Sequence, residues 1–168
     1  MPLFLANLDT ATRTLMTSEI DADIANGNLY LGRRFSAAGE RNYPQLIKDA
    51  AAAHSDDWLG QQLRVGGRLN TTEEKRKPNG GFTTARVPVT AAETFAEGEF
   101  NRFYIRGLCL RAIAEGVPYL VVYRAKAVAN PRPDSEAKIG HMIGPGKAVG
   151  RSSRQPRRRY CVRSAQWP

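Results

Sequence analysis

Apolar residues recur at helical spacing in three segments near the N-terminus. The first predicted helix covers about residues 10–26, where Asp9 or Thr10 can cap the free N–H groups of its first turn. It ends at Gly27, which suits the left-handed residue that follows a helix. The second covers about residues 43–53 and has Pro44 in its first turn, where a missing N–H is tolerated. The third begins after Ser55, whose hydroxyl is a common N-cap. The N-terminal part of the chain is therefore expected to be helical.

The pattern changes over residues 67–89. The sequence Pro78-Asn79-Gly80-Gly81 is a strong turn signal, and the β-forming residues 82–87 after it predict a strand. We therefore expect a hairpin or a long connection whose tip carries three consecutive cations, which are Lys75, Arg76 and Lys77.

A long helix is predicted next. Thr90 and Glu93 have the spacing of a capping box, in which two side chains satisfy each other's free backbone N–H groups. The helix is expected to continue to about Glu115 and to be the central helix of the protein. The residues 119–123 that follow are strongly β-forming and predict a strand. Helices combined with a small sheet indicate an α+β fold.

The last 24 residues differ in composition. From 145 to 168 there is no Leu, Ile or Phe, so this stretch is expected to bury little surface. We therefore expect one α+β domain over residues 1–144 and a flexible basic tail over residues 145–168. Seven cations lie in this tail without one acidic residue among them, namely Lys147, Arg151, Arg154, Arg157, Arg158, Arg159 and Arg163.

The tail accounts for most of the charge. The 168-residue chain has 25 Lys and Arg against 16 Asp and Glu, a formal net charge of +9. Without the seven tail cations, 18 basic residues face 16 acidic ones, so the body is close to neutral. One interpretation is an electrostatic arm along nucleic-acid phosphates, for which seven contacts on a duplex would give a salt slope of roughly −6. The alternative is a solvated terminus without a binding role.

The cations at the predicted hairpin tip have the same two interpretations. Glycines beside Lys75, Arg76 and Lys77 allow close approach to a phosphate backbone. Glu73 and Glu74 partly cancel this charge, however, and a charged turn is commonly just solvated.

The long helix carries a second candidate site. Glu99, Arg102 and Arg106 are spaced three and four residues apart and therefore share one helix face. The planar guanidinium group binds phosphate or carboxylate through two contacts, so this face is a candidate for an anionic ligand. The structural alternative is a set of ion pairs within the fold.

Other chemistry has weaker support in the sequence. The two histidines, His54 and His141, are not near the cysteines and lack metal-ligand spacing, so we expect no metal and no cofactor. Cys109 lies in an apolar helical pattern, which predicts an unreactive buried thiol. No apolar stretch approaches the roughly 20 residues that span a bilayer. We expect a cytoplasmic protein with reduced thiols.

Three functions remain open. The first is a protein that is not an enzyme and makes mostly sequence-nonspecific contacts to nucleic acid through the basic tail, aided by the hairpin cations. The second is a protein–protein assembly module or a subunit of a larger particle. The third is a small enzyme or anion-binding protein that uses the face of Glu99, Arg102 and Arg106.

Overall fold

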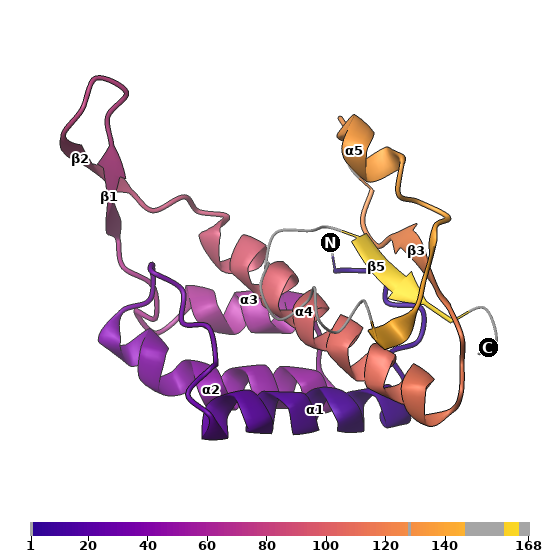
Figure 1. Ribbon diagram of the computed structural model, residues 1–168. Coiled ribbons are helices and arrows are strands. Elements are labelled where there is room, and N and C mark those ends of the chain that lie inside the picture. The colour runs from indigo at the N-terminus through magenta and orange to yellow at the C-terminus, as the bar shows by residue number, and fades with distance from the viewer. Residues whose placement is uncertain (1, 128, 147–159, 165–168) are drawn as a thin grey trace.

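The computed structural model describes residues 2–127, 129–146 and 160–164 (Figure 1). Its helices and strands are, in chain order, α1 (Thr10–Ala25), α2 (Ala37–Ala53), α3 (Asp56–Arg64), β1 (Thr72–Arg76), β2 (Phe82–Arg86), α4 (Ala91–Ala114), β3 (Leu120–Arg124), α5 (Pro133–Glu136), β4 (Met142–Ile143) and β5 (Tyr160–Arg163). The α+β class, the three N-terminal helices and the long central helix are confirmed, and the strands form two small antiparallel sheets where one small sheet was expected. No helix in the described part of the chain is both long and apolar enough to cross a membrane.

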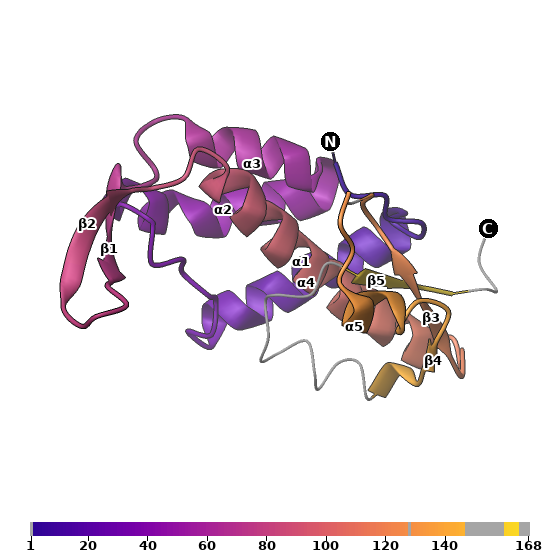
Figure 2. The same cartoon turned by 90° about the horizontal axis from the view of Figure 1, so that it is seen from above.

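Helix α4 is the centre of the fold. It packs against α1 and α3 on one side and against β5 on the other. The two-stranded hairpin β1–β2 and the three-stranded sheet lie at opposite ends of the molecule, with the helices between them (Figures 1 and 2). The hairpin therefore projects away from the helices, whereas the sheet packs on them.

The core is formed where the four long helices meet. Aromatic side chains of α4, among them Phe100, Phe103 and Tyr104, are fully buried. Aliphatic side chains from α1, α2 and α3 surround them, and these include Met16, Ile20, Ile47, Leu59 and Leu63. Because α4 is buried around much of its circumference, its burial supplies a large part of the hydrophobic stabilisation.

Local signals determined the ends of α1 and α3, as expected. The Asp9 carboxylate accepts a hydrogen bond from the Thr12 N–H at 3.0 Å, and the Ser55 hydroxyl accepts one from the Trp58 N–H at 3.2 Å. After α1, Gly27 has a φ of 66°, the left-handed conformation that a residue with a Cβ rarely adopts. These caps are local, so the sequence alone was sufficient to predict them.

The expected start of α2 at residue 43 was wrong. The helix begins at Ala37, and the Ser36 hydroxyl accepts a hydrogen bond from the Gly39 N–H at 3.2 Å. Pro44 therefore lies inside the helix, where its ring removes one backbone hydrogen bond. Tertiary contacts explain this early start, because Ser36 N–H donates to the Arg68 carbonyl at 3.0 Å.

The same contact makes Gly39 a sensitive position. A Cβ at residue 39 would overlap the backbone carbonyl oxygen of Arg68. In an ordinary helix Gly→Ala stabilises by roughly 1 kcal/mol. We expect the opposite for Gly39→Ala, a loss of about 1–3 kcal/mol, because the clash is with backbone. Urea denaturation measures this, with Glu40→Ala in the same turn as the control. A stabilised Gly39→Ala variant would contradict the close approach.

The predicted capping box at the start of α4 does not form. Thr90 has the N-cap position, but its side chain makes no capping hydrogen bond among the described residues. Its φ of −89° and ψ of 7° differ from the extended backbone that places a hydroxyl over the first turn. Glu93 instead forms an ion pair with Arg64 of α3. A tertiary contact has therefore replaced the local one.

The three-stranded sheet has the order β4-β3-β5, and both neighbours of β3 are antiparallel to it. Strand β5 lies in the stretch that we expected to be a flexible tail. The structure instead pairs Val162 with Val122 and buries the side chains of Cys161 and Val162. Residues 160–164 therefore belong to the folded body. Residues 147–159 and 165–168 lie outside the described residues.

Candidate nucleic-acid interface

The hairpin β1–β2 has two different faces. Its register pairs Thr72 with Arg86, Glu74 with Thr84 and Arg76 with Phe82. Side chains that lie directly opposite each other in an antiparallel pair share a face. One face, which we call the outer face, therefore carries Thr72, Glu74, Arg76, Phe82, Thr84 and Arg86. The other face carries Glu73, Lys75, Thr83 and Ala85.

Glu73 attaches the hairpin to the helical body. Its carboxylate accepts two hydrogen bonds from the Arg34 guanidinium, at 2.6 and 2.9 Å. These hydrogen bonds lower the pKa of Glu73, so this carboxylate stays ionised and keeps its ion pair with Arg34. Phe35 and Leu69 form an isolated bridge at the base of the hairpin. The side opposite the outer face is thus the one attached to the body.

The cations of the hairpin are mostly not neutralised. Among the described residues, no carboxylate oxygen lies within 4.0 Å of the side-chain nitrogens of Arg76, Lys77 or Arg86, while Lys75 is 3.8 Å from Glu73. Several cations of the helical body and the sheet, in contrast, form ion pairs, as Lys48 does with Asp21 at 2.6 Å. The hairpin therefore presents three cations, Arg76, Lys77 and Arg86, that have no ion-pair partner among the described residues, although Glu73 and Glu74 of β1 offset part of its charge.

An aromatic side chain lies beside these cations. Phe82 is directly opposite Arg76 on the outer face, and 68% of its surface is exposed. An exposed aromatic ring with adjacent cations is the combination that stacks on bases while the cations contact phosphates. Phe82 was not among the expected site residues. The sequence did place Phe82 directly after the turn, at the start of a strand that the β-forming residues 82–87 already predicted.

The expected tail residues divide into two groups. Arg151, Arg154, Arg157, Arg158 and Arg159 lie outside the described residues. Arg163 is in β5, where its side chain is exposed and its guanidinium carbon is 6.0 Å from the centre of the Tyr123 ring. The sheet and the hairpin are at opposite ends of the molecule (Figure 2). The structure therefore does not bring Arg163 together with Lys75, Arg76 and Lys77.

The second candidate site is a closed ion-pair network. The Arg106 guanidinium donates to Asp23 at 2.6 and 3.0 Å and to Glu19 at 2.6 Å. Arg102 contacts Glu99 at 2.8 Å and Asp23 at 3.4 Å. Glu99 is 1% exposed, and burial raises the pKa of Glu99 although the attraction to Arg102 opposes this. The guanidinium groups of Arg102 and Arg106 therefore contact carboxylates of α1 at the place where we expected an anionic ligand.

Glu19 and Asp23 are the residues that sequence reasoning missed. They are four positions apart on α1, as Arg102 and Arg106 are on α4. Two such pairs on packed helices match each other in spacing, because residues four apart lie on one helix face. The matched spacing was the available signal. The packing of α1 against α4 was needed to interpret it, and that packing is a tertiary fact.

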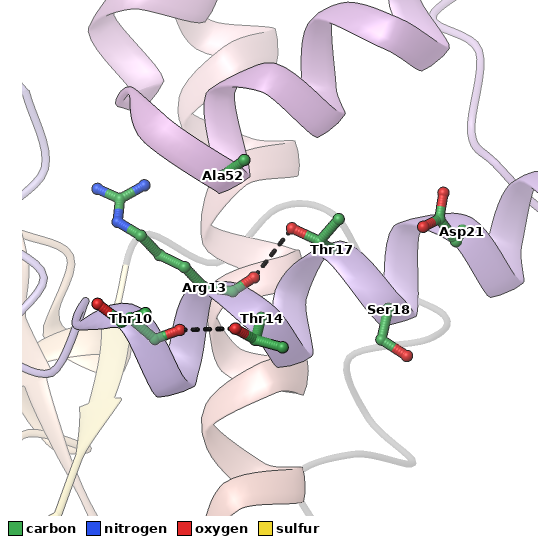
Figure 3. A pocket seen from close by; sticks show the side chains of 7 residues that line it. All are labelled: Thr10, Arg13, Thr14, Thr17, Ser18, Asp21 and Ala52. Carbon is green, nitrogen blue, oxygen red and sulfur yellow. Dashed lines mark hydrogen bonds between the residues drawn. The ribbon is translucent and has the colours of Figure 1, made fainter.

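A groove lies between α1 and α2 in the described part of the chain (Figure 3). Its volume is about 510 Å3, and hydroxyl side chains line one wall. Thr14 and Thr17 donate these hydroxyls to the carbonyls of Thr10 and Arg13, at 2.9 and 3.0 Å. Arg13 donates to the Ala51 carbonyl at 2.8 Å and so caps the end of α2. These polar groups stabilise the helices themselves.

The cysteines are buried and free. Burial raises the pKa of the Cys109 thiol to about 12, so the nucleophilic thiolate is scarce near neutral pH. The Cys161 sulfur contacts the Asn101 side-chain oxygen at 2.6 Å inside the body. In the described part of the chain, no group of three or more His, Cys, Asp and Glu side chains has the arrangement to hold a metal ion.

Comparison of the chain with protein-family models, with curated proteins and with solved structures finds no match in any of the three. The functional argument therefore rests on the geometry of the described residues.

Proposed function

We propose that this protein binds nucleic acid and is not an enzyme, and that the hairpin β1–β2 contacts the phosphate backbone. The observation that carries the proposal is the concentration of unbalanced cations on a projecting hairpin. Arg76, Lys77 and Arg86 have no carboxylate within 4.0 Å among the described residues. A polyanion supplies the counter-charge that the fold leaves out.

The geometry favours contacts that do not depend on sequence. Arginine and lysine on an exposed hairpin reach phosphates more readily than base edges, and phosphate contacts carry no sequence information by themselves. Phe82 adds a ring on which an unpaired base can stack irrespective of its identity. A two-stranded ribbon also has the dimensions that the major groove of a duplex admits.

The arginine-rich stretch remains part of the proposal as an expectation from sequence. Arg151, Arg154, Arg157, Arg158 and Arg159 add five positive charges to the interaction. We place the activity in the cytoplasm. Two free cysteines are consistent with a compartment in which thiols stay reduced.

The salt dependence of binding tests the role of the hairpin. The double variant Arg76→Gln/Lys77→Gln removes two cations from the tip. If both contact phosphates of a duplex, the slope of log K against log salt should decrease in magnitude by about 1.8. Fluorescence anisotropy with a labelled duplex at several salt concentrations measures this slope.

A matched control distinguishes direct phosphate contacts of the hairpin from an effect of the net charge on the salt slope. Arg41→Gln/Arg132→Gln removes two exposed cations that are not part of the hairpin and should change the slope much less. An equal decrease in both double variants would show that only net charge matters. Binding that neither variant changes, or no binding at low salt, would contradict the proposal.

The arginine-rich stretch needs a variant that keeps β5. Deleting residues 147–168 would also remove the buried Cys161 and Val162, so lost binding could reflect lost folding. Replacing the five arginines between residues 151 and 159 by Gln avoids this. If all five contact duplex phosphates, the slope should decrease in magnitude by about 4.5. An unchanged slope would assign the binding to the hairpin alone.

A further inference from the structure

Strand β2 has unpaired peptide groups along its outer edge, by which we mean the backbone edge that faces away from β1. The register of the hairpin is regular, and the Lys77 N–H donates to the Gly81 carbonyl while the Val87 N–H donates to that of Thr71. Hydrogen-bonded and non-hydrogen-bonded pairs alternate in an antiparallel ladder. The pairs Thr72–Arg86, Glu74–Thr84 and Arg76–Phe82 are therefore the non-hydrogen-bonded ones. The N–H and C=O groups of these residues point away from the hairpin.

The two edges of the hairpin are not equivalent. The segment before α2 covers the base of the β1 edge, where the Asn70 N–H donates to the Arg34 carbonyl at 2.8 Å. No backbone hydrogen bond from the described residues reaches Phe82, Thr84 or Arg86 on the outer edge of β2. An edge of this kind is a template for another strand unless charge, proline or a bulge protects it. The register shows no bulge, the first proline after β2 is Pro88, and Arg86 at its end is the one charged residue of the strand.

We propose that the β2 edge pairs with the β2 edge of a second copy of this chain, in antiparallel orientation. The sequence Phe82-Thr83-Thr84-Ala85-Arg86 is complementary to itself in that orientation. With Thr84 opposite Thr84 of the second copy, Phe82 lies opposite Arg86 and all five residues are paired. Of these five, Phe82, Thr84 and Arg86 are the residues whose peptide groups point outward, so their ladder hydrogen bonds to the second copy can form without a change in the hairpin.

The charges favour β2 for this contact. In the pairing centred on Thr84, each Arg86 faces an aromatic ring, and a guanidinium over a ring is an attractive arrangement. The equivalent pairing of β1 centred on Glu74 would place two Glu74 carboxylates opposite each other, which is unfavourable. A two-stranded ribbon is marginal in water, and this pairing would convert it into a four-stranded sheet.

The contact is small. Five residues per strand bury much less than the 1,200–2,000 Å2 of a stable interface, so the dimer is expected to be reversible and to dissociate on dilution. The pairing would also place the cations of two hairpins side by side. The inference does not depend on nucleic-acid binding, however, because it rests on the strand edge alone.

Thr84→Cys tests the pairing and its register. Opposite residues of a hydrogen-bonded antiparallel pair have Cα atoms about 5.5 Å apart, within the range of a disulfide. Mild oxidation of the full-length variant at high concentration should give a covalent dimer on a non-reducing gel. Thr72→Cys, on the other edge, is the control and should give at least tenfold less. Cys109 and Cys161 are buried and present in both variants.

Thr84→Pro tests the hydrogen bonds of the edge. Proline removes an N–H that points away from the hairpin, so the hairpin itself should persist. We expect the concentration-dependent dimer of the wild type, measured by sedimentation equilibrium, to be lost in Thr84→Pro and kept in Thr72→Pro. A wild type that stays monomeric without nucleic acid at all concentrations, or a dimer that Thr84→Pro leaves intact, would overturn the inference. Either result leaves the salt-slope test of nucleic-acid binding unaffected.

Discussion

A chain that ends at residue 159 should lose most of its stability. It lacks β5, whose Cys161 and Val162 side chains are 0% and 3% exposed. Burying a side chain of the size of Val162 contributes about 1.5–3 kcal/mol, and the smaller buried side chain of Cys161 adds to this. A domain has only about 5–15 kcal/mol of net stability, and the deletion should therefore leave it largely unfolded or with a much lower melting temperature.

Polar contacts add to this loss. The Tyr104 hydroxyl, buried on α4, donates to the Val162 carbonyl at 3.3 Å. The side-chain oxygen of Asn7 accepts from the Ser164 N–H at 3.0 Å. Removing β5 would leave Tyr104 and Asn7 without these partners, and a buried polar group without a partner is costly.

Thermal unfolding followed by circular dichroism measures the effect. The control chain ends at residue 164 and keeps every described residue of β5, so it should unfold close to the full-length protein. A chain ending at 159 that matches the control would mean that β5 contributes nothing and that the flexible-tail hypothesis also holds for residues 160–164.

The variant Arg102→Met should be strongly destabilised. Arg102 is 8% exposed and compensates the buried charge of Glu99 from 2.8 Å. Removing one member of a buried ion pair leaves an uncompensated charge, which costs about 3–5 kcal/mol. Urea denaturation at pH 8 measures this loss. Glu99→Gln/Arg102→Met removes both charges and should recover much of the stability, because an apolar replacement of a whole pair is often tolerated.

The deficit of Arg102→Met should depend on pH. Burial raises the pKa of Glu99 above its value in the unfolded chain, and the attraction to Arg102 opposes this rise. Without Arg102 the folded-state pKa should rise further. A group whose pKa is raised by folding stabilises the fold fully below its unfolded pKa, and this stability is lost as pH rises through the folded pKa. The variant should therefore differ less from wild type at pH 5 than at pH 8.

An anion-binding site predicts a different result. If Arg102 and Arg106 served a ligand, added phosphate would raise the melting temperature of the wild type, and Arg102→Met would abolish that shift with little loss of stability. A Glu99 charge that needs no compensation would give a small deficit that does not change between pH 5 and pH 8. Either outcome would argue against the interpretation that the network stabilises the fold.

Helix α2 and strand β5 show why part of the fold escaped prediction. Pro44 suggested a helix start that the docking of Ser36 against Arg68 overrides. Strand β5 is only four residues long, contains Cys161 and Val162 but no Leu, Ile or Phe, and is surrounded by arginines in the sequence. Its pairing with β3 joins residues about 40 positions apart, and no local pattern reports a contact of that range.

The candidate interface was predicted to a similar extent. The cations Lys75, Arg76 and Lys77 and the turn beside them were evident in the sequence, whereas Phe82 and the free edge of β2 were not. Which face a side chain occupies depends on the register of the hairpin, and a shift of one residue would reverse it. The register is visible only when the two strands are seen paired.

By itself, the sequence determined the features that depend on neighbouring residues. These are the caps at Asp9 and Ser55, the end of α1 at Gly27, the turn before β2 and the length of α4. The tertiary structure alone decided which charges are available. Arg102 and Arg106 meet carboxylates because α1 packs on α4, whereas Arg76, Lys77 and Arg86 meet none among the described residues because their hairpin projects away from the body. Charge is a local property of the chain, but its neutralisation depends on which segments folding brings together.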